Sequence, residues 1–150
     1  MKSKLHKKRL GFQRERELVR QFWKRGFACM RAPASGAKTK RTPYPDIVAI
    51  KNGRIFIIEV KTREKRSTVY IPNGQMLKLL EFSRRSGGLA LIALKFIDGS
   101  GWRFIEVSKL ERTRSGNWKV TPEMWDEGLT IEDLDRMCRG EKSLEEYIKS

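Results

Sequence analysis

The chain has 150 residues, of which 39% are hydrophobic and 34% are charged, and its formal net charge is +15. This length suits one compact domain, and no stretch approaches the roughly 18 apolar residues of a membrane span, so no membrane partner is expected. Residues 1–122 carry 29 Lys and Arg against 9 Asp and Glu, whereas residues 123–150 carry 4 against 9. A basic body of this size indicates a polyanionic partner, for which nucleic acid is the default.

The number and spacing of the cysteines and histidine limit the catalytic and metal-binding groups that the chain can use. Cys29 and Cys138 are far apart in the sequence, which is neither a disulfide framework nor a zinc-binding spacing. We expect both to be buried thiols in a reducing, cytoplasmic compartment. The single histidine, His6, lies among basic residues. Histidine-based metal sites and Ser-His or Cys-His nucleophiles are therefore close to excluded, and any catalysis must use carboxylates, lysine and a metal ion.

The first predicted elements are a basic arm over residues 1–10 and a helix over about 11–25. The apolar stripe of this helix consists of Phe12, Val19, Phe22 and Trp23, with Leu18 beside it. Glu15 falls on the same stripe, three residues after Phe12 and four before Val19. Either this inward carboxylate pairs with a neighbouring arginine at the edge of the stripe, or it has a function.

A strand over residues 27–32 and a loop over 33–43, rich in small residues, are expected next. A β-hairpin then follows, because Asn52-Gly53 separates two apolar runs and is the strongest short signal for a two-residue turn. With that turn Asp46 lies directly across from Glu59, about 5 Å away between Cβ atoms on one face. Lys61 shares the face with Glu59, because strand side chains alternate with period two.

Like charges that face each other repel, so this pair of carboxylates calls for a cation. A bulge at the turn would shift the register by one residue. The competing interpretation is a solvated hairpin with scattered charges. Apolar residues on both faces of the two strands argue against it, since they indicate a strand pair that is covered on both sides.

The remainder of the chain is predicted to complete an α/β fold, a single domain with a central mixed β-sheet flanked by helices. After the basic stretch 61–66 we expect strands over 69–71, 89–96, 102–107 and 117–120, and a helix over 74–85 that Asn73 caps. Thr130-x-x-Asp133 and Ser143-x-x-Glu146 resemble capping boxes, so short helices are expected near the acidic end. The predicted division is an arm (1–10), a catalytic body (11–122) and an acidic helical tail (123–150).

Opposed carboxylates are hard oxygen ligands suited to Mg²⁺ or Mn²⁺. Such an ion accepts phosphate oxygens and lowers the pKa of a bound water. A lysine on the same face can orient or deprotonate that water. Asp46, Glu59 and Lys61 therefore form a candidate site for phosphodiester hydrolysis, and the surrounding basic residues would follow the nucleic-acid backbone.

A family resemblance appears at these residues. Pro45-Asp46 followed by Glu59-Val60-Lys61 matches the PD-(D/E)xK nuclease signature, which is short and weak when taken alone. The wider match is more specific, and over about residues 8–110 the chain resembles archaeal Holliday junction resolvases of the Hjc type. The segments that carry it are Gly11–Leu18, Gly26–Ala28, Arg31–Gly36, Glu81–Gly88 and Trp102–Val107. The resemblance implies a restriction-endonuclease-like fold.

The resemblance also implies roles for individual residues. It makes Glu15, Asp46 and Glu59 metal-binding acids, adds the Val60 carbonyl as a ligand, and makes Lys61 the catalytic lysine. Ser35 matches a serine near the scissile phosphate, and Gln75 resembles a helix glutamine of part of the wider superfamily. The expected cofactor is Mg²⁺, with Mn²⁺ as a substitute. The expected DNA-binding residues are Lys7, Lys8, Arg9, Arg16, Arg31, Lys38, Lys40, Arg41, Arg63, Lys65 and Arg66.

The implied function is a homodimeric endonuclease that makes paired, symmetric nicks in four-way DNA junctions. Two alternatives remain open: a nuclease for other branched or duplex DNA, and a non-catalytic junction- or RNA-binding protein. The dimer interface is expected in the second half of the chain, built from Leu77, Leu80, Phe82, Phe96, Trp102 and Phe104. The alternative is that these residues simply fill the core of the monomer. The acidic tail is either a cover for the domain or a docking segment for a replication or recombination protein.

Overall fold

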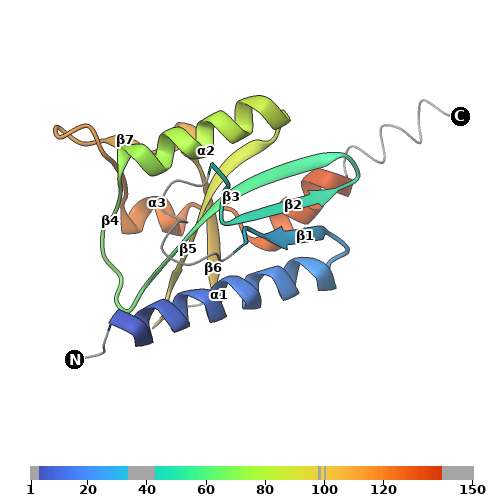
Figure 1. The fold of residues 1–150 in the computed structure, drawn as a ribbon, viewed down its shortest axis with the longest axis horizontal. Helices are drawn as coiled ribbons and strands as arrows, with labels where there is room; N and C mark the ends of the chain where they lie inside the picture. The colour runs from blue at the N-terminus through green and yellow to red at the C-terminus, as the bar shows by residue number, and fades with distance from the viewer. Residues whose placement is uncertain (1–3, 34–42, 98, 100, 140–150) are drawn as a thin grey trace, which may run out of the picture.

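A five-stranded mixed sheet forms the centre of the molecule (Figure 1). The computed structural model describes residues 4–33, 43–97, 99 and 101–139, and only the backbone of Lys7 and Lys8. The spatial order of the strands is β1 (Ala28–Arg31), β2 (Ile47–Lys51), β3 (Arg54–Arg63), β5 (Leu89–Phe96) and β6 (Trp102–Glu106). β3 and β5 run parallel, and the other neighbours are antiparallel. The predicted mixed α/β fold is confirmed.

The β2–β3 hairpin has the predicted turn and register. Asn52 and Gly53 both adopt positive φ, at 52° and 80°, as a type I′ turn requires. Lys51 pairs with Arg54 and Ile47 pairs with Ile58, so no bulge shifts the strands. The same register, continued by one residue, sets Asp46 at the entrance of β2 opposite Glu59.

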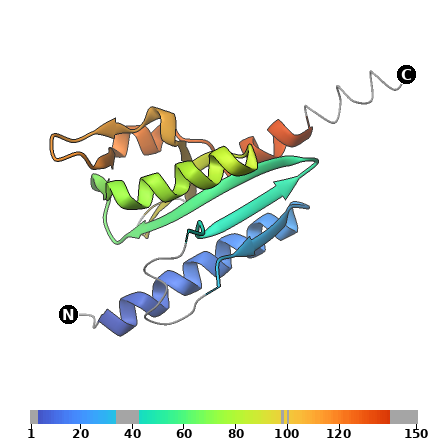
Figure 2. The same cartoon turned by 45° about the horizontal axis from the view of Figure 1, so that its top comes forward.

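One face of the sheet is covered by α1 (Lys4–Lys24) and by a helical segment at residues 131–139 (Figure 2). Leu18 and Phe22 of α1 have no exposed surface and pack among the sheet residues of this face. The ring of Phe22 meets those of Phe27 and Phe104 at 5.0 and 5.7 Å between centroids. α1 is therefore fixed along its middle and its end, the part that carries Glu15.

The opposite face is covered by α2 (Asn73–Ser86), α3 (Pro122–Asp126) and a small second sheet. That sheet has the order β4 (Val69–Ile71), β8 (Trp118–Val120), β7 (Glu111–Arg112), and a 3-10 turn (Val107–Lys109) lies between β6 and β7 in the chain. α2 joins the parallel strands β3 and β5. At Gly88 a Cβ atom would lie 2.9 Å from the Ile55 carbonyl oxygen, so this position needs glycine for the close approach.

The element boundaries differ from expectation at two helices. α1 begins at Lys4, so residues 4–10, expected as an arm, form its first turns. Trp23, expected on the buried stripe, is 59% exposed, and its indole N–H donates to the Cys29 carbonyl. Asn73 does not cap α2; it is the first residue of the helix, and its side-chain oxygen accepts from the Trp118 indole. The division into arm, body and tail stays a prediction.

Three residues expected at a dimer interface belong to the core instead. Phe96 is 1% exposed, Trp102 is 7% exposed and Phe104 has no exposed surface. The strands that carry them are covered on both faces by the chain's own helices and small sheet, so these rings are unavailable to a partner. Leu77 and Leu80 on α2 are exposed, at 58% and 40%.

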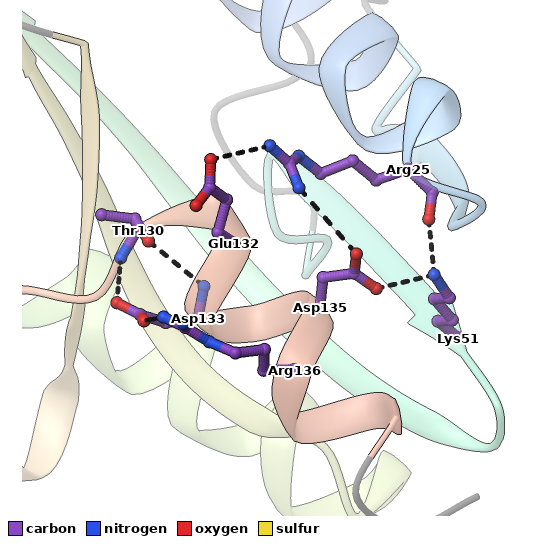
Figure 3. Close-up of polar contacts among 7 residues, drawn as sticks. All are labelled: Arg25, Lys51, Thr130, Glu132, Asp133, Asp135 and Arg136. Carbon is purple, nitrogen blue, oxygen red and sulfur yellow. Dashed lines mark hydrogen bonds and ion pairs between the residues drawn. The ribbon is translucent and has the colours of Figure 1, made fainter.

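The 131–139 segment is held by a polar network at the hairpin end of the sheet (Figure 3). Lys51 Nζ donates to Asp135 at 2.6 Å and to the Arg25 carbonyl at 2.5 Å, and Arg25 also pairs with Glu132 at 3.2 Å. The predicted Thr130-x-x-Asp133 capping box is confirmed, because each residue's backbone N–H donates to the other's side chain. The second predicted box, at Ser143 and Glu146, lies outside the described residues.

Two remaining expectations concern the cysteines and the membrane. Cys29 and Cys138 are both buried and free, as predicted. Burial raises the pKa of the Cys29 thiol to about 12, which keeps it protonated and unreactive. Among the described residues, no helix has the length and apolar character that crossing a membrane requires.

Candidate active site

Asp46 and Glu59 meet where β2 begins beside the middle of β3. The Val60 backbone N–H donates to Asp46 Oδ2 at 2.8 Å, which fixes the Asp46 carboxylate against β3. The backbone of Asp46 is held from the other side, because its carbonyl accepts from the Ala32 N–H at 3.0 Å. Glu59 follows the fully buried Ile58 and turns a mostly buried side chain, 16% exposed, toward the same point.

Lys61 completes this group from the same strand. Its Nζ lies 4.0 Å from Glu59 Oε1 and donates to Gln75 Oε1 at 2.6 Å. Gln75 lies in the first turn of α2, and the helix is thereby connected to the site. With a side chain only 15% exposed, Lys61 is held in one position. No spacing in the sequence predicts this contact, because residues 64–72, which include β4, lie between the strand and the helix and periodicity does not reveal their path.

Glu15 reaches the same region from α1, as its place on the buried stripe predicted. Its side chain is 18% exposed and lies 3.7 Å from the Arg31 guanidinium. Arg31 also donates to the Phe12 carbonyl at 3.2 Å and lies over the Phe12 ring. The pairing with an arginine, one of the two interpretations of Glu15, is thus present, and the same carboxylate also feels the charge of Asp46.

The carboxylates repel one another electrostatically. Burial and the Asp46 charge raise the pKa of Glu15 to about 7, against the lowering effect of Arg31 and Arg16. Burial raises the pKa of Glu59 as well, reinforced by the charge of Asp46 and a hydrogen bond with it, while Lys61 opposes the rise. Burial and the neighbouring Asp46 charge therefore both disfavour the charged forms of Glu15 and Glu59.

A divalent cation fits this donor set. Carboxylate oxygens are hard ligands, and Mg²⁺ is commonly held by one or two carboxylates together with waters and substrate phosphates. Asp46 and Glu59 are two such carboxylates. Burial, and after it the Asp46 charge, raise the pKa of Glu59, and an added cation would oppose both effects. Within the described residues no three His, Cys, Asp or Glu side chains are grouped closely enough to hold a metal by themselves. The remaining ligands would come from water and phosphate.

The residues predicted to bind DNA fall into three groups. Arg9 and Arg16 are exposed on α1, and Arg31 lies beside Glu15. Arg63 and Lys65 are exposed where β3 ends and the chain leads to β4. The third group lies outside the described residues: Lys38, Lys40 and Arg41 entirely, and Lys7 and Lys8 for their side chains. Ser35, predicted as a catalytic residue, lies outside them as well.

Arg66 has a structural partner that the sequence did not reveal. Its guanidinium forms two hydrogen bonds with the Asp126 carboxylate, at 2.7 and 2.6 Å. The pair links the segment between β3 and β4 to α3. Its two residues are 60 positions apart in the chain, so no local sequence pattern could predict it. Both side chains are about half exposed, so the pair adds little to stability.

The fold and the arrangement of these residues define a class. A mixed sheet that presents Pro45-Asp46 and Glu59-x-Lys61 from two adjacent strands is the architecture expected of PD-(D/E)xK nucleases. The chain further belongs to the archaeal Holliday junction resolvase (Hjc) family, whose model matches residues 6–143.

Individual relatives agree with this assignment. The chain is 40% identical over 122 residues to the crossover junction endodeoxyribonuclease Hjc of Sulfurisphaera tokodaii, covering 81% of this chain and 83% of that protein. It is 39% identical over 135 residues to the Hjc of Archaeoglobus fulgidus, covering 89% and 90%. The solved structure of Archaeoglobus fulgidus Hjc, a Holliday junction resolvase, superimposes with a TM-score of 0.74 at 35% identity, over 83% of this chain and 99% of that one. For a nuclease family of this kind a divalent metal ion is implied.

Proposed function

We propose that this protein is a structure-selective endonuclease that resolves four-way DNA junctions by metal-dependent hydrolysis of phosphodiester bonds. The observation that carries the proposal is the meeting of Asp46, Glu59 and Lys61 on one hairpin, within a chain of the resolvase family. The net charge of +15 supports a polyanionic substrate.

Asp46 and Glu59 would hold Mg²⁺, or Mn²⁺ in its place, with Glu15 and the Val60 carbonyl as further candidates. A bound divalent ion supplies charge neutralisation at the phosphate and an acidified water. The protein's own part is to fix the acids: the Val60 N–H orients Asp46, and Arg31 keeps Glu15 from repelling the phosphate at full strength.

Lys61 would act on the attacking water or on the phosphate oxygens. Gln75 accepts a hydrogen bond from one N–H of the Lys61 ammonium, which leaves the other two N–H donors of Lys61 for the site. Gln75 is thus a positioning residue that acts through Lys61. Ser35 is proposed beside the scissile phosphate on the family resemblance alone.

A homodimer would supply the second site that paired nicks require. Each chain has one Asp46–Glu59 pair, and a junction with near two-fold symmetry is matched by a C₂ dimer. An apolar surface beside α2 supports this proposal. Met30, Ile50 and Leu80 are 65%, 38% and 40% exposed, and a groove between β1 and α2 is lined by Met30, Val48 and Phe82.

The cleavage of a set of substrates tests the function. Four-way junction, linear duplex of the same sequence and RNA are each incubated with the protein with Mg²⁺ and with EDTA. Rapid cleavage of the junction alone, only with Mg²⁺, is the expected result. Equal cleavage of duplex would indicate a nuclease for duplex DNA, and binding without any cleavage would indicate an architectural protein.

A further inference from the structure

The β7–β8 hairpin carries basic residues that the proposed function has not used. The segment from Lys109 to Lys119 holds four basic side chains and one acidic side chain, Glu111. It forms the edge of the small sheet and projects past the beginning of α2 (Figure 2). A charged segment is usually only a solvated surface, unless its side chains are held in place and left without counter-charges.

The first observation is how the hairpin is attached. The Trp118 indole N–H donates to Asn73 Oδ1 at 3.1 Å, and Asn73 N–H donates to Asn117 Oδ1 at 3.1 Å. Asn73 is the first residue of α2, and Gln75, two residues later, contacts Lys61. The root of the hairpin is therefore fixed beside the candidate active site.

The second observation is that the hairpin is internally rigid. Thr113 N–H donates to the Asn117 carbonyl at 2.8 Å, and Asn117 N–H donates to Thr113 Oγ1 at 3.1 Å. The turn closes at Gly116, whose φ of +86° is readily adopted by glycine. A closed turn presents its tip, with Arg114, at a defined position instead of leaving it free to move.

The third observation concerns the arginines. The Arg112 guanidinium stacks 5.0 Å over the Trp118 ring, which holds the planar group in place while leaving the residue exposed. Arg114 is exposed at the tip and has no ion-pair partner within the described part of the chain. Glu111 forms an ion pair with Lys119 at 3.5 Å. Two arginines thus project unneutralised from a rigid element, the arrangement that suits phosphate oxygens.

We propose that the β7–β8 hairpin is a second DNA-binding element, which grips the phosphate backbone of one junction arm through Arg112 and Arg114. The inference rests on the proposed function and adds where an arm is held. Because Asn117 and Trp118 are fixed to the beginning of α2, which carries Gln75, the phosphates that Arg112 and Arg114 contact would lie on an arm beside the candidate active site and not at the cleaved bond.

The test is the salt dependence of junction binding by the full-length protein with both arginines replaced, Arg112→Gln and Arg114→Gln. The control replaces Arg136→Gln, near the β2–β3 turn (Figure 3), and Lys24→Gln, the last residue of α1 and the neighbour of Arg25, whose carbonyl accepts from Lys51; together they remove the same charge far from the β7–β8 hairpin. Binding is measured between 50 and 200 mM salt in Ca²⁺, to prevent cleavage. Melting temperatures establish that both variants are folded.

Two lost phosphate contacts per chain, four in the proposed homodimer, should flatten the slope of log K against log salt by about 3.6. Over this salt range the affinity of the hairpin variant should then fall about 150-fold less than that of wild type, whereas the control should deviate far less from wild type. The single phosphates whose blocking weakens binding of wild type, but not of the hairpin variant, should cluster on one junction arm per chain.

Equal slopes for the hairpin variant and the control would overturn the inference. That result is separate from failure of the proposed function, because the function fails only if wild type does not cleave the junction with Mg²⁺. A folded wild type that cleaves, together with a hairpin variant that binds with an unchanged slope, would leave the function standing and remove the hairpin from it.

Discussion

At the scale of single residues, replacing Lys61 separates a role in catalysis from a role in DNA binding. Lys61→Ala should reduce turnover roughly 10²- to 10⁴-fold, because a positioned proton donor or acceptor is lost. Junction affinity should hardly change, since Lys61 is one of 33 basic residues. Single-turnover cleavage and gel-shift binding separate the two effects. Cleavage within a few-fold of wild type would make Lys61 only another phosphate contact.

Gln75 should matter only through Lys61. Its side-chain oxygen accepts from Lys61 Nζ at 2.6 Å, so Gln75→Ala frees the lysine to adopt other rotamers. We expect a loss of about ten- to a hundred-fold in single-turnover rate, the usual scale for a supporting contact. In a Lys61→Ala background the same change should have no further effect. Additive losses in the double variant would show that Gln75 acts elsewhere.

Single residues also show how much of the candidate site could be predicted from the sequence alone. The Asn52-Gly53 turn, together with period-two alternation, was enough to predict that Asp46 faces Glu59 and that Lys61 joins them. The helical stripe was enough to predict that Glu15 points inward. Gln75 and the Arg66–Asp126 pair were not predicted as contacts, because they depend on how distant elements dock, which no local period encodes.

At the scale of elements, the 131–139 segment depends on one buried carboxylate. Asp135 is 7% exposed and accepts from Lys51, whose own side chain is 19% exposed. Asp135→Asn should leave that ammonium without its counter-charge and lower the free energy of unfolding by roughly 2 kcal/mol. Denaturant unfolding near neutral pH measures this. Glu81→Gln, which breaks the exposed ion pairs with Arg84 and Arg85 on α2, is the control and should lower stability far less.

The stabilisation from Asp135 should also depend on pH. The hydrogen bond from Lys51 lowers the pKa of Asp135 in the folded protein below the usual value of 3.8. A group with a lowered folded pKa stabilises the fold above its unfolded pKa, and this contribution is lost as the pH falls through the folded value. The stability gap between wild type and Asp135→Asn should therefore be constant above about pH 5 and shrink below about pH 4. A gap that widened on acidification would contradict this interpretation.

Element boundaries show where prediction from sequence was limited. The strands other than β7 were recovered in their order of appearance, because each is an apolar run near Gly, Pro or Asn. β7 was missed because its two residues, Glu111 and Arg112, are both charged and form no apolar run. The start of α1 at Lys4 was missed because residues 4–10 carry mainly basic side chains, which resemble a solvated arm although Lys and Arg are good helix formers. Trp23 was misplaced because its helical position lies at the edge of the stripe, where its N–H can reach the Cys29 carbonyl.

At the scale of the whole molecule, the proposed dimer depends on contacts between two complete chains. Leu77→Glu with Leu80→Glu should convert a dimer to a monomer in light scattering, because both side chains are exposed on α2 and a buried unpaired charge is costly. Replacing Phe96 or Phe104 would instead unfold the chain, since both are core residues. A wild-type monomer that makes paired nicks would remove the need for this interface.

Paired nicking follows from two sites in fixed relation. A mixed dimer with one Asp46→Ala chain should nick a cruciform plasmid and fail to linearise it in one binding event. Release of linear product by such a mixed dimer would mean that one chain can cut both strands in turn.

The central claim is that Asp46 and Glu59 form a metal-dependent hydrolytic site while the rest of the basic body binds the junction. The most direct measurement compares binding and cleavage of one labelled four-way junction by wild type, Asp46→Ala and Glu59→Ala, with Mg²⁺ present for cleavage. Both variants should bind as tightly as wild type or tighter, because a carboxylate that repels phosphate is gone, and should cut at least roughly a thousand-fold more slowly. Folded variants that lose binding in step with cleavage, or that still cut at a rate near wild type, would contradict the account.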